Sequence, residues 1–137
     1  MKQEIVKLMN EEIDVFSTID TSTSAGRKLS LVCINNSPTK RVSDYIGKQI
    51  TFDAVVMTKV KLEDDKKVGK EVEAIQTVLH TPDGETVACT SQGFAESICM
   101  ILSCLGYPDT WEEEYWFEVK QIETRKGRRL FKLEFID

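Results

Sequence analysis

The stretch Gln49-Ile-Thr-Phe-Asp-Ala-Val-Val-Met-Thr-Lys-Val-Lys-Leu62 carries the clearest strand pattern in the chain. Every second residue from Ile50 to Leu62 is apolar or Thr, whereas the intervening positions end in Lys59 and Lys61. Successive side chains of a strand point to opposite faces of a sheet. We therefore predict a long strand over residues 49–62, with one buried face and one face that becomes basic toward its end.

Downstream of this strand, turn signals divide the sequence into two further strands. The charged residues 63–70 predict a hairpin loop, and the apolar positions within residues 71–81 predict the returning strand. Residues 82–84, Pro-Asp-Gly, predict a tight turn because Pro presets the turn backbone and Gly tolerates a positive φ. A short strand over residues 85–89 then completes a three-stranded meander.

The apolar period lengthens at residues 91–105, which predicts a helix. Ser91 suits the N-cap position, and Gly106 suits the end of the helix. The apolar positions at helical spacing are Phe94, Ile98, Ile101, Leu102 and Leu105. The aromatic stretch 115–123 and the apolar stretch 129–136 predict two more strands, joined by a basic turn.

The beginning of the chain has weaker patterns. Residues 2–13 have the spacing of a short amphipathic helix, and the Ser- and Thr-rich residues 17–26 read as a polar linker. Residues 28–34 read as an extra strand. Residues 35–48 read as a loop, with one helical turn around Tyr45.

Three strands, a helix and two strands, in this order, are typical of the OB-fold. Closing such short strands into a barrel protects their edges from pairing with other chains. We therefore predict a mostly β protein: a five-stranded OB-fold β-barrel over residues 27–137, with one helix between the third and fourth barrel strands. Residues 1–26 would form a separate N-terminal helix and linker.

Charge is distributed unevenly along the sequence. The net charge of −5 by itself argues against a nucleic-acid partner. However, residues 25–70 carry +5 and residues 120–137 carry +3, whereas residues 71–119 carry −10 with no Lys or Arg. The two basic segments contain the two hairpin loops that flank the ligand groove of an OB-fold.

The basic residues of these two segments are therefore candidate phosphate ligands, which would release counterions when they bind a nucleic acid. They are Lys59, Lys61, Lys66, Lys67, Lys70, Lys120, Arg125, Lys126, Arg128 and Arg129. The groove would be floored by strands 50–62 and 71–81 and bounded by loops 59–70 and 124–129. A Lys-rich hairpin loop also keeps a sheet edge soluble, and this alternative stays open for loop 63–70.

Single-stranded nucleic acids also need aromatic side chains on which bases stack. Trp116 is the better candidate in the Tyr115-Trp116-Phe117 cluster, because it shares a strand face with the charged Glu118 and Lys120. Tyr45, in the loop before the long strand, is the second candidate. Core packing is the alternative for every aromatic residue.

Residues 50–136 resemble the small single-stranded-DNA-binding proteins of tailed phages, including those of protein-primed Bacillus phages. The similar elements are the Lys-bearing strand before a charged loop, Glu71-Val72-Glu73, Asp83-Gly84, the helix opened by Ser91, and the hairpin at residues 124–127. The resemblance implies an OB-fold that coats replicating single strands without sequence preference. The N-terminal helix and the Tyr115-Trp116-Phe117 cluster depart from the family pattern.

We expect no enzymatic activity, cofactor or metal. His80 is the only histidine, phosphate-binding and dinucleotide motifs are absent, and the four cysteines have no metal-site spacing. We expect those cysteines to be reduced, buried thiols in a cytoplasmic protein, located in the host cytoplasm if a phage encodes it. We expect no membrane association, because no long apolar run or secretory signal occurs.

Two alternative functions remain open at this point. The acidic, aromatic segment 107–118 favours a protein-interaction module that binds no nucleic acid. A small hydrolase would depend on His80. Replication proteins are potential partners in addition to single-stranded DNA, and self-association through the N-terminal helix would give a homo-oligomer.

Overall fold

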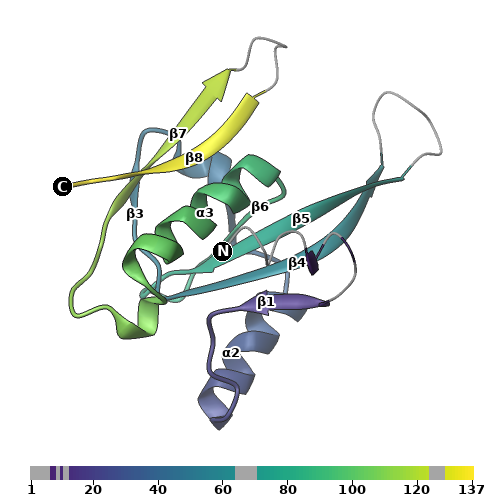
Figure 1. Ribbon diagram of the computed structural model, residues 1–137, viewed down its shortest axis with the longest axis vertical. Helices are drawn as coiled ribbons and strands as arrows, with labels where there is room; N and C mark the ends of the chain where they lie inside the picture. Colours follow the sequence, from purple (N-terminus) through teal and green to yellow (C-terminus); the bar gives the residue numbers. More distant parts are fainter. Residues whose placement is uncertain (1–6, 9, 11–12, 64–70, 124–128) are drawn as a thin grey trace.

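Two β-sheets enclose one helix in the computed structural model, which describes residues 7–8, 10, 13–63, 71–123 and 129–137. The larger sheet has the strand order β1-β4-β5-β6-β2, and the smaller has the order β3-β7-β8. Figure 1 shows helix α3 (Gln92–Leu105) between the β7–β8 ribbon and the larger sheet. The protein is therefore mostly β, as predicted.

The larger sheet is built on the predicted meander. β4 (Ala54–Glu63) and β5 (Glu71–His80) pair antiparallel along their whole length, and β6 (Thr86–Cys89) pairs with the end of β5. Gly84 adopts a φ of 91° in the predicted turn between β5 and β6, a conformation that glycine takes at no steric cost. β1 (Val15–Ser17) adds to the free edge of β4, and β2 (Lys40–Arg41) runs parallel to β6.

The predicted strand 49–62 is wrong as a single element, because it bends and enters both sheets. β3 (Gln49–Ile50) pairs with β7 (Phe117–Glu123), which pairs with β8 (Arg129–Phe135). The prediction placed every second residue from Ile50 onward on the buried face. After the bend, the residues that face the main core are instead Val55 and Met57.

Both faces of β4 are consequently buried over Ala54–Met57, whereas Lys61 near its end is exposed, in line with the prediction of a face that becomes basic toward its end. Val55 and Met57 belong to the main core, whereas Val56 belongs to a second cluster with Cys33. The bend is held by the Asp53 backbone N–H, which donates to the His80 carbonyl at 2.8 Å. The Asp53 carboxylate also lies 2.6 Å from His80 Nδ1.

The predicted helix α3 is confirmed together with its ends. The Ser91 hydroxyl accepts a hydrogen bond from the Phe94 N–H at 3.3 Å, and Gly106 at the C-terminus has a φ of 78°. The buried face of α3 consists of Phe94, Ala95, Ile98, Cys99 and Leu102. This face fills the space between the two sheets, and it fixes their relative position.

The predicted extra strand at residues 28–34 is wrong, because these residues belong to helix α2 (Ser24–Asn35). Thr23 caps the helix by accepting the Gly26 N–H at 3.0 Å. Leu29 and Cys33, one helical turn apart, pack in the second cluster against the outer face of the larger sheet. A short apolar run is equally compatible with a strand and a helix, so the local pattern could not decide between them.

The predicted linker over residues 17–26 is also wrong, since β1 and the first turn of α2 occupy both of its ends. Thr18 is buried, and its hydroxyl accepts the Val55 N–H at 3.0 Å. The proposed domain boundary after residue 26 falls inside α2. Most of the predicted N-terminal helix lies outside the described residues, although Leu8 is fully buried in the main core.

The element order β4-β5-β6-α3-β7-β8 has the predicted sequence of three strands, a helix and two strands. Short 3₁₀ helices, η1 (Val42–Tyr45) and η2 (Pro108–Thr110), precede β3 and β7. Within the part of the chain that the structure describes, β2 occupies the outer edge of β6 and no ladder joins β6 to β8. The closed barrel therefore stays a prediction. No described helix has both the length and the apolar character needed to cross a membrane.

Candidate nucleic-acid interface

Most of the predicted basic loop residues belong to segments that the structure does not describe. Lys66, Lys67, Lys70, Arg125, Lys126 and Arg128 lie outside the described residues. Arg129 begins β8, opposite Glu123. Figure 1 shows the β7–β8 ribbon rising to the top of the view and the β4–β5 ribbon running to the right. We call the loop-bearing ends of the two ribbons their basic ends, after the sequences of the loops that join their strands.

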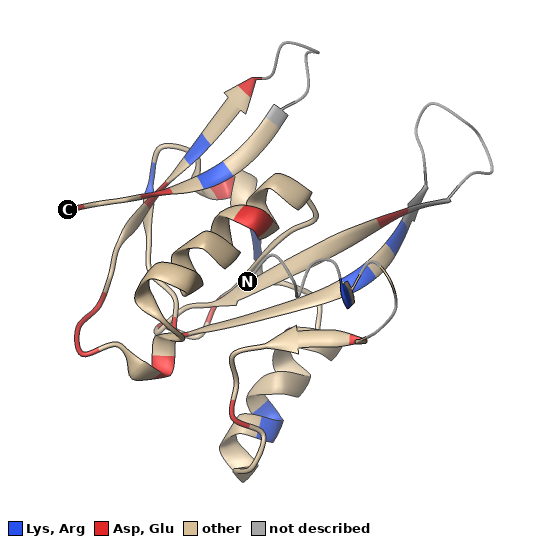
Figure 2. Ribbon diagram, viewed as in Figure 1, with Lys and Arg blue, Asp and Glu red and all other residues tan. Residues whose placement is uncertain are grey.

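Of the three predicted lysines on the ribbons, two form ion pairs with neighbouring carboxylates. Lys59 Nζ lies 3.1 Å from Glu73 Oε2 on β5, and Lys120 Nζ lies 3.2 Å from Glu118 Oε2 on its own strand. The hydrogen bond and charge of Glu118 raise the pKa of Lys120. Lys61 is exposed. Figure 2 shows basic and acidic residues interspersed on both ribbons, so a phosphate must compete with carboxylates there.

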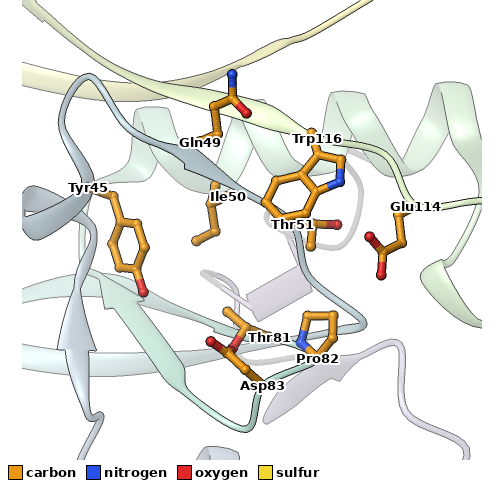
Figure 3. A pocket seen from close by; sticks show the side chains of 9 residues that line it. All are labelled: Tyr45, Gln49, Ile50, Thr51, Thr81, Pro82, Asp83, Glu114 and Trp116. Carbon is orange, nitrogen blue, oxygen red and sulfur yellow. The ribbon is translucent and has the colours of Figure 1, made fainter.

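The two predicted aromatic residues lie in one hollow at the opposite end of the ribbons. This aromatic hollow has a volume of about 250 Å³ and lies between β3, the start of β7 and the β5–β6 turn. Figure 3 shows Tyr45 and Trp116 on opposite sides of it, with Ile50 and Thr51 between them. Trp116 is 41% exposed, which excludes the alternative that this side chain packs in the core.

Tyr45 is held in place by its hydroxyl group. The hydroxyl donates to Glu85 Oε2 at 2.8 Å, and the ring packs against the main core. Burial, reinforced by the Glu85 hydrogen bond and charge, raises the pKa of Tyr45 to about 12. The hydroxyl thus stays protonated at neutral pH, and the orientation of the ring in the hollow is fixed.

Carboxylates give the aromatic hollow a negative rim. Asp83 and Glu114 both line it, and Figure 3 shows both side chains beside Pro82. Thr81 donates a hydrogen bond to the Asp83 carboxylate, which lowers the pKa of that carboxyl group. Fixed negative charge repels a phosphate, but a carboxylate accepts hydrogen bonds from the amino groups of bases. The hollow therefore suits a base better than a phosphate.

The other aromatic residues near Trp116 pack inward. Phe52 stacks on Phe117 with ring centroids 5.6 Å apart, and Trp111 makes an edge contact with Tyr115 at 5.1 Å. The Trp111 indole N–H also donates to the Gly106 carbonyl at 3.0 Å. Most aromatic side chains of the acidic segment 107–118 thus pack in or against the core, which weakens the case for reading it as a protein-docking surface.

A second hollow escaped the sequence analysis. This seam groove, of about 500 Å³, lies where the edge of β6 approaches β8, and Arg41 and Phe131 contribute to its lining. The sequence held one signal of this groove, because five of the ten Lys and Arg residues of segment 25–70 precede residue 49. The prediction instead placed the positive charge of this segment in the hairpin loop that follows. The position of Arg41 beside Phe131 depends on tertiary structure.

The cysteine prediction needs one correction. All four cysteines are free, and Cys33, Cys89 and Cys99 are buried, but Cys104 is exposed near the end of α3. Burial raises the pKa of Cys33 to about 11. Among the described residues, no three His, Cys, Asp or Glu side chains are grouped as metal ligands.

A family model described as phage single-stranded DNA-binding protein matches residues 9–136. The match covers both sheets, both hollows and the helix between the sheets. No curated protein and no solved structure matches the chain.

Proposed function

Because the chain belongs to the phage single-stranded DNA-binding protein family, we propose that it coats single strands during phage DNA replication without reading their sequence. The observation that carries the binding mode is the aromatic hollow. Tyr45 and Trp116 come from distant parts of the sequence, and both line it. Such aromatic surfaces accept any base, because every base has a π face.

In the proposed binding mode, a base enters the aromatic hollow and stacks on the exposed indole of Trp116. Tyr45 forms the opposite wall, and the carboxylates of Asp83 and Glu114 keep the phosphates outside. The phosphates contact the basic residues of the ribbons and of the loops 59–70 and 124–129. Lys59 and Lys120 would exchange their carboxylate partners for phosphates, and counterion release would make the affinity salt-dependent.

The element order supports a common groove for these contacts. In an OB-fold, the loops between the first two and the last two strands flank the bound strand. Here these are the loops between β4 and β5 and between β7 and β8. The barrel, the groove and docking of replication proteins are parts of the proposal.

A titration of fluorescent oligo-dT at low and moderate salt tests the proposal. We expect affinity to fall as salt rises, and Trp116→Ala to weaken binding by about 5- to 150-fold, the equivalent of one lost stack. Met100→Ala is the matched control, because Met100 is an exposed apolar residue on α3 that lines neither hollow. Absence of binding at low salt, or binding that ignores salt, would contradict the proposal.

A further inference from the structure

We propose that the seam groove holds the middle of the bound DNA strand, with Arg41 on a phosphate and Phe131 beneath a base. This inference rests on the proposed function and extends it to residues outside the predicted interface. The groove is about 500 Å³, twice the aromatic hollow. Besides Arg41 and Phe131, its polar lining includes Ser43, Gln76 and Thr90.

The charge of the seam groove differs from that of the ribbons. Lys59 and Lys120 have carboxylate partners, and Lys40 lies 3.8 Å from Glu85. Arg41 is exposed and forms no ion pair with another described residue, and none of the described residues lining the groove is acidic. Its guanidinium can therefore bind a phosphate without displacing a carboxylate, and its planar donors suit phosphate oxygens.

Phe131 supplies the apolar surface that a base requires. Its ring is partly buried, packs against the main core on one side and lines the groove. The hydroxyl groups of Ser43 and Thr90 and the amide of Gln76 line the same space, and they can donate to or accept from any base. This combination of a cation without a described carboxylate partner, an aromatic ring and neutral polar groups is typical of sequence-tolerant strand binding.

Strand register places the groove between the aromatic hollow and the basic ends of the ribbons. Gln76 is in the middle of β5, whereas the hollow-lining Thr81 follows the end of that strand. Phe131 pairs with Gln121, two positions from the Glu123–Arg129 pair that ends the β7–β8 ladder. A DNA strand that passes from the aromatic hollow to the basic ends of the ribbons would thus cross the seam groove.

Helix η1 connects the two hollows. Tyr45, its last residue, lines the aromatic hollow, whereas Val42 and Ser43 line the seam groove. The Asp44 carboxylate, the one acid in η1, accepts the Arg41 backbone N–H at 2.9 Å. A single strand can therefore contact both hollows on either side of one short helix.

The test compares the salt dependence of oligo-dT binding in the full-length chain and its Arg41 variants. We expect Arg41→Ala to reduce the slope of log affinity against log salt by about 0.7, the value of one single-strand phosphate contact. Arg41→Lys should keep the wild-type slope. Lys28→Ala removes an exposed cation on α2 that lines neither hollow, and it should leave the slope unchanged.

A second variant tests the base contact separately. Phe131→Leu keeps an apolar side chain against the core, so we expect the fold to persist, the affinity to drop by about 5- to 150-fold and the slope to stay unchanged. An unchanged slope for Arg41→Ala, with salt-dependent binding by the wild type, would overturn the inference and leave the proposed function standing. Failure of the wild type to bind would instead overturn the proposed function.

Discussion

The aromatic hollow and the seam groove lie on either side of η1, yet their charges are opposite. The hollow combines Trp116 and Tyr45 with the carboxylates of Asp83 and Glu114. The groove combines Phe131 with Arg41, which has no ion pair with another described residue, and has no acid among its described lining residues. Each has an aromatic ring, so the difference lies in what surrounds the ring. In the proposed binding mode, the hollow takes a base alone and the groove takes a base with its phosphate.

The largest expected effect comes from the core that supports both hollows. Phe52 is buried against Trp111 and Phe117, beside the bend between β3 and β4. Phe52→Ala should lower the free energy of unfolding by about 3–5 kcal/mol, because it removes a large buried side chain and leaves a cavity. Urea denaturation measures this change, and the exposed Met100→Ala should alter it by less than about 0.5 kcal/mol. A small effect of Phe52→Ala would mean that the hollow does not rest on this core.

A smaller effect should come from neutralising the hollow. Glu114→Gln should strengthen oligo-dT binding at low salt, by up to about fivefold, because a carboxylate near the phosphates costs about 1 kcal/mol in water. Arg41→Ala removes one charge of the opposite sign and should weaken binding. Glu113→Gln is the control, since Glu113 lies in the same loop but does not line the hollow. Weaker binding by Glu114→Gln would show that the carboxylate contacts the DNA favourably.

The smallest effect at neutral pH concerns Tyr45, whose pKa is raised to about 12 mainly by burial. The folded protein therefore holds the phenolic proton more tightly than the unfolded chain, whose tyrosines titrate near pH 10. The resulting stabilisation is fully present below about pH 10 and is lost as the pH rises through about 12. Near-ultraviolet absorbance should show a late step in tyrosine titration that disappears in Tyr45→Phe. Persistence of that late step in Tyr45→Phe would assign it to another tyrosine.

The sequence predicts elements well where periodicity and turn chemistry agree. The β4–β5–β6 meander and α3 are cases of this kind, since Gly84 marks a turn and Ser91 and Gly106 mark helix ends. α2 was misread because the apolar run 28–34 has no decisive period. The bend at residues 51–53 escaped because it follows from pairing with β7, a strand more than sixty residues later in the sequence.

The candidate site was less predictable than the fold. Trp116, which precedes β7, is exposed, as its alternation with Glu118 and Lys120 indicates, whereas its contact with DNA stays a prediction. Its meeting with Tyr45 depends on tertiary packing, as does the seam groove around Arg41. The ion pair of Lys59 with Glu73 depends on the register of β4 and β5, which local sequence does not encode.

The bend between β3 and β4 has a mechanical consequence. Only three residues separate a strand of the smaller sheet from a strand of the larger one, and α3 packs on both sheets. Neither sheet can then detach while the other persists, because separation would strip the core from α3 and stretch a very short connection. We therefore expect the two sheets to lose their structure in a single cooperative transition. A force applied through a DNA strand bound in both hollows would then act on both sheets together.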